Sequence, residues 1–277
     1  MKPDYDLHIH TTASDGVLTP SEIIDMAVGI GLKGIAISDH DTVAGLEEAE
    51  HYLSITDYPL DFINAVELNT EVGNDDVHIL GYFIDSKNIA LKQRLEDIRN
   101  SRYRRAEQMV RRLQELGLEI DFTQVEELAQ GELIARPHIA RVLIDNNYAT
   151  SIREAFDKYI GRRAPGYVPR YKFLPTEAIE LVKNAGGIAV LAHPGLIEDN
   201  RKVMEVIDLG IEGLEVFYPE HTPEQTEELL ELARRHHLLI TGGSDYHGPS
   251  STESRSSMGA AGVSKGLVKQ MYTYLKS

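Results

Sequence analysis

The chain of 277 residues contains no cysteine, which excludes disulfide bonds and zinc sites built from thiolates. It also lacks an apolar run long enough to span a membrane, and its first residues show no signal-peptide pattern. We therefore expect no membrane association and a cytoplasmic location. Any metal site in this protein must use imidazole nitrogen or oxygen ligands.

Basic residues are scarce: 28 Lys and Arg stand against 44 Asp and Glu, a formal net charge of −16. The deficit is uneven, because residues 92–172 carry 16 basic and 12 acidic side chains, a net charge of +4. The remainder carries 12 basic and 32 acidic side chains, a net charge of −20. The acidic field argues against indiscriminate binding of long nucleic acid, so we expect no stable nucleic-acid partner. The basic middle either accommodates a small phosphate-bearing ligand or is a solvated face of Arg-rich helices.

Short apolar runs alternate with helix patterns in the first and last parts of the chain, as in βαβ units with buried parallel strands. The expected strands lie at residues 4–8, 34–38, 60–66, 77–82, 187–191, 213–216 and 238–241. Between about residues 89 and 160, apolar residues recur at helical spacing instead. The sequence therefore predicts an α/β barrel over residues 1–98 and 166–277, interrupted by a helical insertion over residues 99–165.

Histidines and acids stand at or near the ends of these apolar runs. They occur in the segments His8-Ile9-His10, Ser38-Asp39-His40-Asp41, Val66-Glu67, Ala192-His193-Pro194 and Asp245-Tyr246-His247. Alternate residues of an extended strand point the same way, so His8 and His10 can reach one metal ion. The carboxyl ends of parallel barrel strands meet at the face that carries the chemistry of such barrels. The pattern predicts a hydrolytic metal centre.

Together with His78, these segments resemble the ordered motifs of the PHP (polymerase and histidinol phosphatase) family over the whole barrel. The resemblance implies a distorted (β/α)7 TIM-like barrel that binds two or three divalent metal ions. It also implies three ligand sets: His8, His10, Glu67 and Asp245; Glu67, His78 and His193; and Asp15, His40 and His247. Several trinuclear members carry a histidine in place of Asp15. The harder oxygen ligand favours Mn²⁺, with Zn²⁺ or iron as the alternatives.

Several other polar residues have two interpretations each. Asp39 and Asp41 are candidates for supporting the ligands through hydrogen bonds, although Asp41 could instead cap the following helix. His221, just beyond a strand end, is either a catalytic or phosphate-contacting residue or a loop histidine. Glu215 is a barrel-interior acid or a supporting acid, and His78 could be a core histidine rather than a ligand.

The insertion carries a closer resemblance, to PHP phosphoesterases that include 3′,5′-nucleoside bisphosphate phosphatases and 5′-3′ oligoribonucleotide exonucleases. Residues 135–141 and 161–169 look like the insert segments of that subgroup. Arg136 and His138 begin a helix, whose free N–H groups favour an anion. The planar fork of arginine also suits phosphate oxygens. We expect Arg136, His138, Arg162 and Arg163 to bind substrate, and Arg136 also to assist catalysis. Alternatively, Arg162 and Arg163 belong to a linker that faces solvent.

The resemblance implies a phosphatase that removes the 3′-phosphate of nucleoside 3′,5′-bisphosphates through attack of a metal-activated hydroxide, leaving 5′-nucleotides. The insertion would act as a substrate cap, and His221 or a metal-bound water would protonate the leaving oxygen. The alternatives are a 5′-3′ exonuclease on short RNA, a histidinol phosphatase and a non-catalytic metal- or nucleotide-binding protein. A C–N hydrolase of the amidohydrolase type would place a bridging modified lysine where this chain has Glu67.

Overall fold

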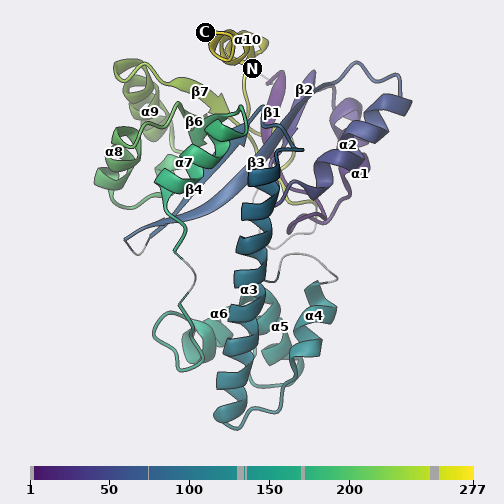
Figure 1. Cartoon of the computed structure of the whole chain (residues 1–277), viewed down its shortest axis with the longest axis vertical. Helices are drawn as coiled ribbons and strands as arrows, with labels where there is room; N and C mark the ends of the chain where they lie inside the picture. The colour runs from purple at the N-terminus through teal and green to yellow at the C-terminus, as the bar shows by residue number, and fades with distance from the viewer. Residues whose placement is uncertain (1–2, 74, 130–133, 135, 170–171, 250–255) are drawn as a thin grey trace. The chain divides into compact units, whose positions relative to one another are not determined.

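The computed structural model describes residues 3–73, 75–129, 134, 136–169, 172–249 and 256–277 (Figure 1). The chain divides into two compact units. The first, the barrel unit, comprises Met1–Gln93 and Lys172–Ser277, and the second, the helical unit, comprises Arg94–Tyr171.

The barrel unit is built on one seven-stranded sheet whose strands are neighbours in sequence order. The strands are β1 (Tyr5–Ile9), β2 (Gly34–Ile37), β3 (Asp61–Val72), β4 (Asp75–Tyr82), β5 (Ile188–Leu191), β6 (Gly213–Phe217) and β7 (Leu239–Gly242). The segment after β7 returns to β1, where the Asp245 N–H donates to the His8 carbonyl and the His10 N–H donates to the Tyr246 carbonyl. The expected distorted (β/α)7 barrel is confirmed.

Strand β4 is the source of the distortion, because it runs antiparallel to both β3 and β5. We expected parallel strands throughout, and for β4 this was wrong. Only residues 73 and 74 separate β3 from β4, and a parallel crossover needs a dozen or more residues. The reversal matters for the site, since it places the beginning of β4 beside the end of β3.

Helices surround the strands of the barrel unit (Figure 1). They are α1 (Pro20–Gly29), α2 (Ala44–Ile55), α7 (Pro175–Asn184), the 3₁₀-helix η2 (Pro194–Leu196), α8 (Asn200–Asp208), α9 (Pro223–Arg235) and α10 (Lys265–Tyr274). Helix α1 begins with a capping box, in which Thr19 and Glu22 each accept the other's backbone N–H. Such a cap contributes about 1 kcal/mol. Leu7, Ala65, Leu80 and Val190 belong to a buried hydrophobic core of this unit.

The helical unit has a hydrophobic core of its own. Its elements are α3 (Ile89–Glu115), α4 (Phe122–Ala129), α5 (Arg136–Asp145), α6 (Ile152–Ala155) and the π-helix η1 (Phe156–Ile160). The first residues of α3, before Arg94, belong to the barrel unit. Met109 and Leu113 of α3 pack with Val125, Ile139 and Ile160. Among the described residues, no helix combines the length and the apolar character that crossing a membrane requires.

Candidate metal centre

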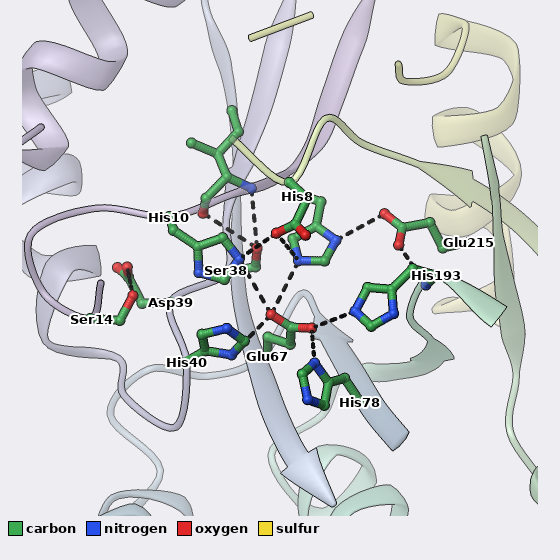
Figure 2. Close-up of polar contacts among 12 residues, drawn as sticks. His8, His10, Ser14, Ser38, Asp39, His40, Glu67, His78, His193 and Glu215 are labelled. Atoms are coloured by element: carbon green, nitrogen blue, oxygen red, sulfur yellow. Dashed lines mark hydrogen bonds and ion pairs between the residues drawn. The ribbon is translucent and has the colours of Figure 1, made fainter. Parts of the chain in front are cut away.

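Nine histidine and acidic side chains, Glu67 among them, gather at one end of the barrel strands. The buried carboxylate of Glu67 faces the rings of His8, His10, His40, His78 and His193 (Figure 2). The nine residues are His8, His10, Asp15, His40, Glu67, His78, His193, Asp245 and His247. Most follow the carboxyl end of a parallel strand, as the sequence predicts. His78 precedes its apolar run instead, and the reversed direction of β4 brings it to the same end.

The nine side chains form three groups of candidate ligands. In the first group four atoms converge: Nε2 of His8, Nε2 of His10, Oε2 of Glu67 and Oδ1 of Asp245. The two histidine nitrogens lie 3.2 and 3.3 Å from Glu67 Oε2, and 3.3 and 3.0 Å from Asp245 Oδ1. Ligands about 2.1 Å from one ion stand about 3.0–3.4 Å apart in octahedral or tetrahedral geometry. The four atoms therefore have the spacing that one divalent ion requires.

The second group consists of Glu67, His78 and His193, and it uses the other oxygen of Glu67. Oε1 lies 2.8 Å from His78 Nδ1 and 3.2 Å from His193 Nε2. His40 Nδ1 approaches the first oxygen, Oε2, at 3.0 Å. One carboxylate thus presents a separate oxygen to each of two histidine sets, which is the arrangement of a bridging metal ligand.

A third group surrounds Asp15. Its carboxylate oxygens lie 3.4 Å from His247 Nε2, 3.6 Å from His10 Nδ1 and 3.7 Å from His40 Nε2. These separations are longer than those of the first group. Within the described residues, both ring nitrogens of the buried His10 and Nε2 of His247 lack a hydrogen-bond partner of acceptable geometry. Since buried polar atoms are rarely left unsatisfied, their arrangement fits a site for cations.

Charges within the cluster compensate one another. Burial alone would lower the pKa of His10, but the carboxylates of Asp245 and Glu67 outweigh it and raise the pKa to about 10. Burial alone would raise the pKa of Glu67, but His40, His8 and His78 hold that pKa well below its usual range. In the metal-free protein, protons on His8 and His10, whose pKa values are both raised, therefore offset part of the carboxylate charge. A metal ion would replace those protons, so metal binding would release them.

Three strand ends adopt the left-handed backbone region. Asp41, His193 and Asp245 have φ angles of 49°, 29° and 54°. Non-glycine residues in this region cost of order 1–3 kcal/mol each, and such residues concentrate at functional sites. Here they turn the chain sharply after β2, β5 and β7, next to the ligand side chains.

Asp39 and Asp41 support the loops that carry the ligands. Asp39 accepts hydrogen bonds from the Thr11 N–H (2.7 Å), the Thr11 hydroxyl (2.8 Å) and the Ser14 hydroxyl (2.6 Å). In the described part of the chain these donors, and not the histidines, occupy its carboxylate. Asp41 accepts from the Asn69 N–H and side-chain amide, and the same amide lies 3.2 Å from His40 Nδ1. Asp39 therefore holds the loop after β1, whereas Asp41 acts on His40 through Asn69.

The structure gives His221 a different environment from the one expected of a proton donor. Its Nδ1 hydrogen-bonds the Val216 carbonyl at 2.9 Å, and its Nε2 accepts the Gly195 N–H at 3.1 Å. Burial also lowers the pKa of His221. The ring is thus a neutral imidazole that ties the loop after β5 to the end of β6. Because both nitrogens are occupied, the expected catalytic role loses its support.

Sequence reasoning missed Tyr218 as a site residue. Its hydroxyl donates to Asp245 Oδ2 at 2.9 Å, which leaves Asp245 Oδ1 facing His8 and His10. Burial and the nearby Asp245 carboxylate raise the pKa of Tyr218 far above its usual value. A tyrosine shortly after a strand end was the only signal in the sequence.

The four expected substrate contacts lie in the helical unit. Arg136 and His138 occupy the first turn of α5, and the Arg136 guanidinium stands 5.2 Å from the centre of the Phe156 ring. Arg162 and Arg163 are exposed on the segment after η1. Ala135, which precedes Arg136 in the insert segment, lies outside the described residues. The structure thus gathers the nine candidate ligands in one unit and the four candidate phosphate contacts in the other.

Comparison with known proteins identifies the family. Residues 6–161 match the PHP domain. The 5′-3′ exoribonuclease Rnm of Escherichia coli is 36% identical over 250 residues, covering 88% of this chain and 85% of that protein. The 3′,5′-nucleoside bisphosphate phosphatase of Chromobacterium violaceum is also 36% identical over 250 residues, covering 88% and 87%.

A solved structure agrees with the sequence comparisons. A protein described as a metal-dependent phosphoesterase, from Bifidobacterium adolescentis, has a TM-score of 0.84 at 31% identity over 99% of this chain and 96% of that one. This chain belongs to the PHP domain family. The family expected from the motifs is therefore confirmed, and the fold resembles that of a solved metal-dependent phosphoesterase.

Proposed function

We propose that this protein is a metal-dependent phosphoesterase that removes the 3′-phosphate of nucleoside 3′,5′-bisphosphates and leaves 5′-nucleotides. The observation that carries the proposal is the cluster of nine imidazole and carboxylate side chains that includes Glu67. Within it, His8, His10, Glu67 and Asp245 have the spacing that one divalent ion requires. Its relatives bear the names of a bisphosphate phosphatase and an exoribonuclease, both of which act on phosphoester bonds.

The nine residues would hold two or three divalent ions, with Mn²⁺ favoured by the carboxylate of Asp15 and Zn²⁺ or iron as alternatives. Such ions lower the pKa of water and neutralise phosphate oxygens. Glu67, whose two oxygens face different histidines, would be a ligand shared by two of these ions. His10 and His40, each next to more than one group, would tie the third group to the other two.

Residues of the helical unit would bind the second phosphate of the substrate. The first N–H groups of α5 favour an anion, and Arg136 and His138 stand in that turn. Arg162 and Arg163 add exposed positive charge. We propose that the unit serves as a substrate cap, with Arg136 neutralising phosphate charge as the ester bond breaks.

The second candidate function is a 5′-3′ exonuclease acting on short RNA. The equal identity, 36%, to the exoribonuclease and to the bisphosphate phosphatase favours keeping it. Both reactions break a phosphoester bond at the same type of centre, so they differ in how much of the substrate the helical unit admits. A cytoplasmic location and the lack of a stable nucleic-acid partner stay predictions from the sequence.

Product analysis separates the two functions. Metal-stripped protein is supplied with Mn²⁺ and given 3′-phosphoadenosine 5′-phosphate or a short 5′-phosphorylated RNA. Release of phosphate with AMP as product, and little RNA degradation, supports the phosphatase. Stepwise release of mononucleotides with poor bisphosphate turnover assigns the exonuclease instead, and no turnover of either substrate with any divalent metal refutes the proposal.

A matched pair of variants tests the substrate contacts. Arg136→Ala should raise KM at least tenfold, because a charge-assisted contact to phosphate contributes about 1.5–3 kcal/mol. Arg141→Ala is the control, since Arg141 lies on the same helix and pairs with Asp145 on the surface. Equal KM values for both variants and the wild type would remove Arg136 from the binding site.

A further inference from the structure

The carboxylate of Glu215 makes two hydrogen bonds next to the metal centre. Glu215 lies in β6, and its side chain has no exposed surface. Its Oε1 lies 3.0 Å from His8 Nδ1, and its Oε2 accepts the His193 backbone N–H at 2.8 Å (Figure 2). A buried carboxylate is costly unless it is well paired, and here both oxygens have a partner.

The first contact fixes the orientation of His8. A carboxylate can only accept, so the Nδ1 of His8 carries the proton and donates it to Glu215. The opposite nitrogen, Nε2, then points at Glu67 Oε2 and Asp245 Oδ1, 3.2 and 3.3 Å away. Glu215 thus selects the ring nitrogen that His8 offers to the first group.

The second contact fixes the backbone of His193. His193 has a left-handed backbone with φ 29°, which is unfavourable for a residue with a Cβ. The hydrogen bond from its N–H to Glu215 holds this conformation. In it, His193 Nε2 lies 3.2 Å from Glu67 Oε1, the oxygen that faces the second group.

We propose that Glu215 is the positioning residue that couples the two groups, because one rigid carboxylate orients a ligand on each side of Glu67. This inference rests on the proposed function, since it requires that the two groups hold metal ions. It assigns to Glu215 no contact with substrate or metal. Partners of ligand histidines of this kind typically affect metal affinity by 10–100-fold.

The substitution Glu215→Gln tests the inference with little change of shape. An amide has one accepting oxygen, whereas His8 Nδ1–H and the His193 N–H both need an acceptor. Whichever way the amide faces, one of the two donors loses its partner. We expect the affinity for Mn²⁺ to fall 10–100-fold. The assay is a titration of the metal-stripped protein in which the concentrations of free and bound Mn²⁺ are measured.

Glu212→Gln is the matched control. Glu212 precedes β6, and its two oxygens also accept two donors, the Ala189 N–H of β5 at 2.9 Å and the Tyr274 hydroxyl at 3.0 Å. It supports the same pair of strands away from the metal centre. We expect it to bind Mn²⁺ as the wild type does. Thermal melting of the metal-free proteins shows whether either substitution acts through stability alone.

The outcomes are distinguishable. Weaker Mn²⁺ binding by Glu215→Gln, with wild-type binding by Glu212→Gln, supports the inference. Unchanged affinity of folded Glu215→Gln, with or without a lower melting temperature, overturns the inference and leaves the proposed function standing. A wild-type protein that binds no divalent metal overturns both.

A second variant covers a failure of Glu215→Gln to fold. Glu215→Asp keeps the charge but shortens the side chain by one methylene, so its carboxylate cannot reach both donors. It should also bind Mn²⁺ at least tenfold more weakly. Wild-type Mn²⁺ affinity in this variant would show that metal binding depends on the charge of residue 215 and not on its two directed contacts, and would overturn the inference.

Discussion

The substitution Glu67→Gln tests whether one carboxylate serves two metal ions. Glu67 presents Oε2 to His8 and His10 and Oε1 to His78 and His193. An amide keeps the shape but replaces one oxygen by a donating NH₂ group, which cannot bind a cation, and it also removes the negative charge. One group therefore loses a ligand atom, and the other keeps only a neutral oxygen. We therefore expect one substitution to weaken both metal groups at once.

The magnitude follows from binding linkage. At a free metal concentration 100 times Kd, one occupied site stabilises the folded state by about 2.7 kcal/mol, so two sites give about 5 kcal/mol. For a protein of this size each kcal/mol raises Tm by roughly 2–4 °C, so Mn²⁺ should raise the wild-type Tm by roughly 10–20 °C. Glu67→Gln should lose most of this increase at the same metal concentration.

Asp245→Asn is the comparison, because Asp245 Oδ1 lies against His8 and His10, on the side of Glu67 Oε2 and not of Oε1. It should keep roughly half of the increase, since the second site stays intact. The assay is thermal melting of metal-stripped wild type and both variants, with and without Mn²⁺. If Glu67→Gln kept the full increase, or lost no more than Asp245→Asn, the bridging role of Glu67 would be refuted.

Three further predictions concern single residues of the barrel unit. Tyr218→Phe removes the hydrogen bond to Asp245, a loss of about 1 kcal/mol, and should weaken Mn²⁺ binding roughly fivefold in a titration. The metal-free protein should become less stable as pH rises from about 6.5 to about 10 in melting experiments. The reason is that the raised pKa of His10 means tighter proton binding in the folded state, and the stability it gives is lost as that proton leaves. Gly243→Ala should destabilise the protein by several kcal/mol in denaturant titrations, because its Cβ would lie 2.3 Å from the Cβ of His8 and 2.4 Å from its backbone nitrogen.

Each of these predictions has a clear contrary result. Equal Mn²⁺ affinity in Tyr218→Phe would show that Asp245 needs no support. Metal-free stability that stays level or rises between pH 6.5 and 10 would contradict the protonated state of His10, and saturating Mn²⁺ should remove the decline, because metal replaces the proton. Wild-type stability of Gly243→Ala would mean that β1 and the end of β7 can separate without cost.

The sequence predicted the parts of the site that depend on local pattern. His8 and His10 stand two residues apart at the end of β1, so their common direction follows from the geometry of an extended chain. Strand ends of a closed barrel share a face, which brought Asp245 and His193 to the same place. The antiparallel direction of β4 was missed, although the dipeptide Gly73-Asn74 shortly before it is a hairpin signal.

The sequence offered Glu215, Asp39 and Asp41 as candidates for supporting the ligands, but their partners could not be predicted, because those contacts join distant parts of the chain. Glu215 is 207 residues from His8 in sequence. A single acid inside the apolar run of β6 signals only that it must be paired. His221 and Tyr218 lie three residues apart after the same strand, yet one bonds the backbone and the other bonds Asp245. Only the side-chain directions distinguish the two roles.

The most direct test of the account is a Mn²⁺ titration of metal-stripped protein, with bound metal and phosphate release from 3′-phosphoadenosine 5′-phosphate measured in the same samples. The account predicts no release without metal, and release that rises as the two groups sharing Glu67 fill. Full turnover by chelator-treated protein with no bound metal would contradict it.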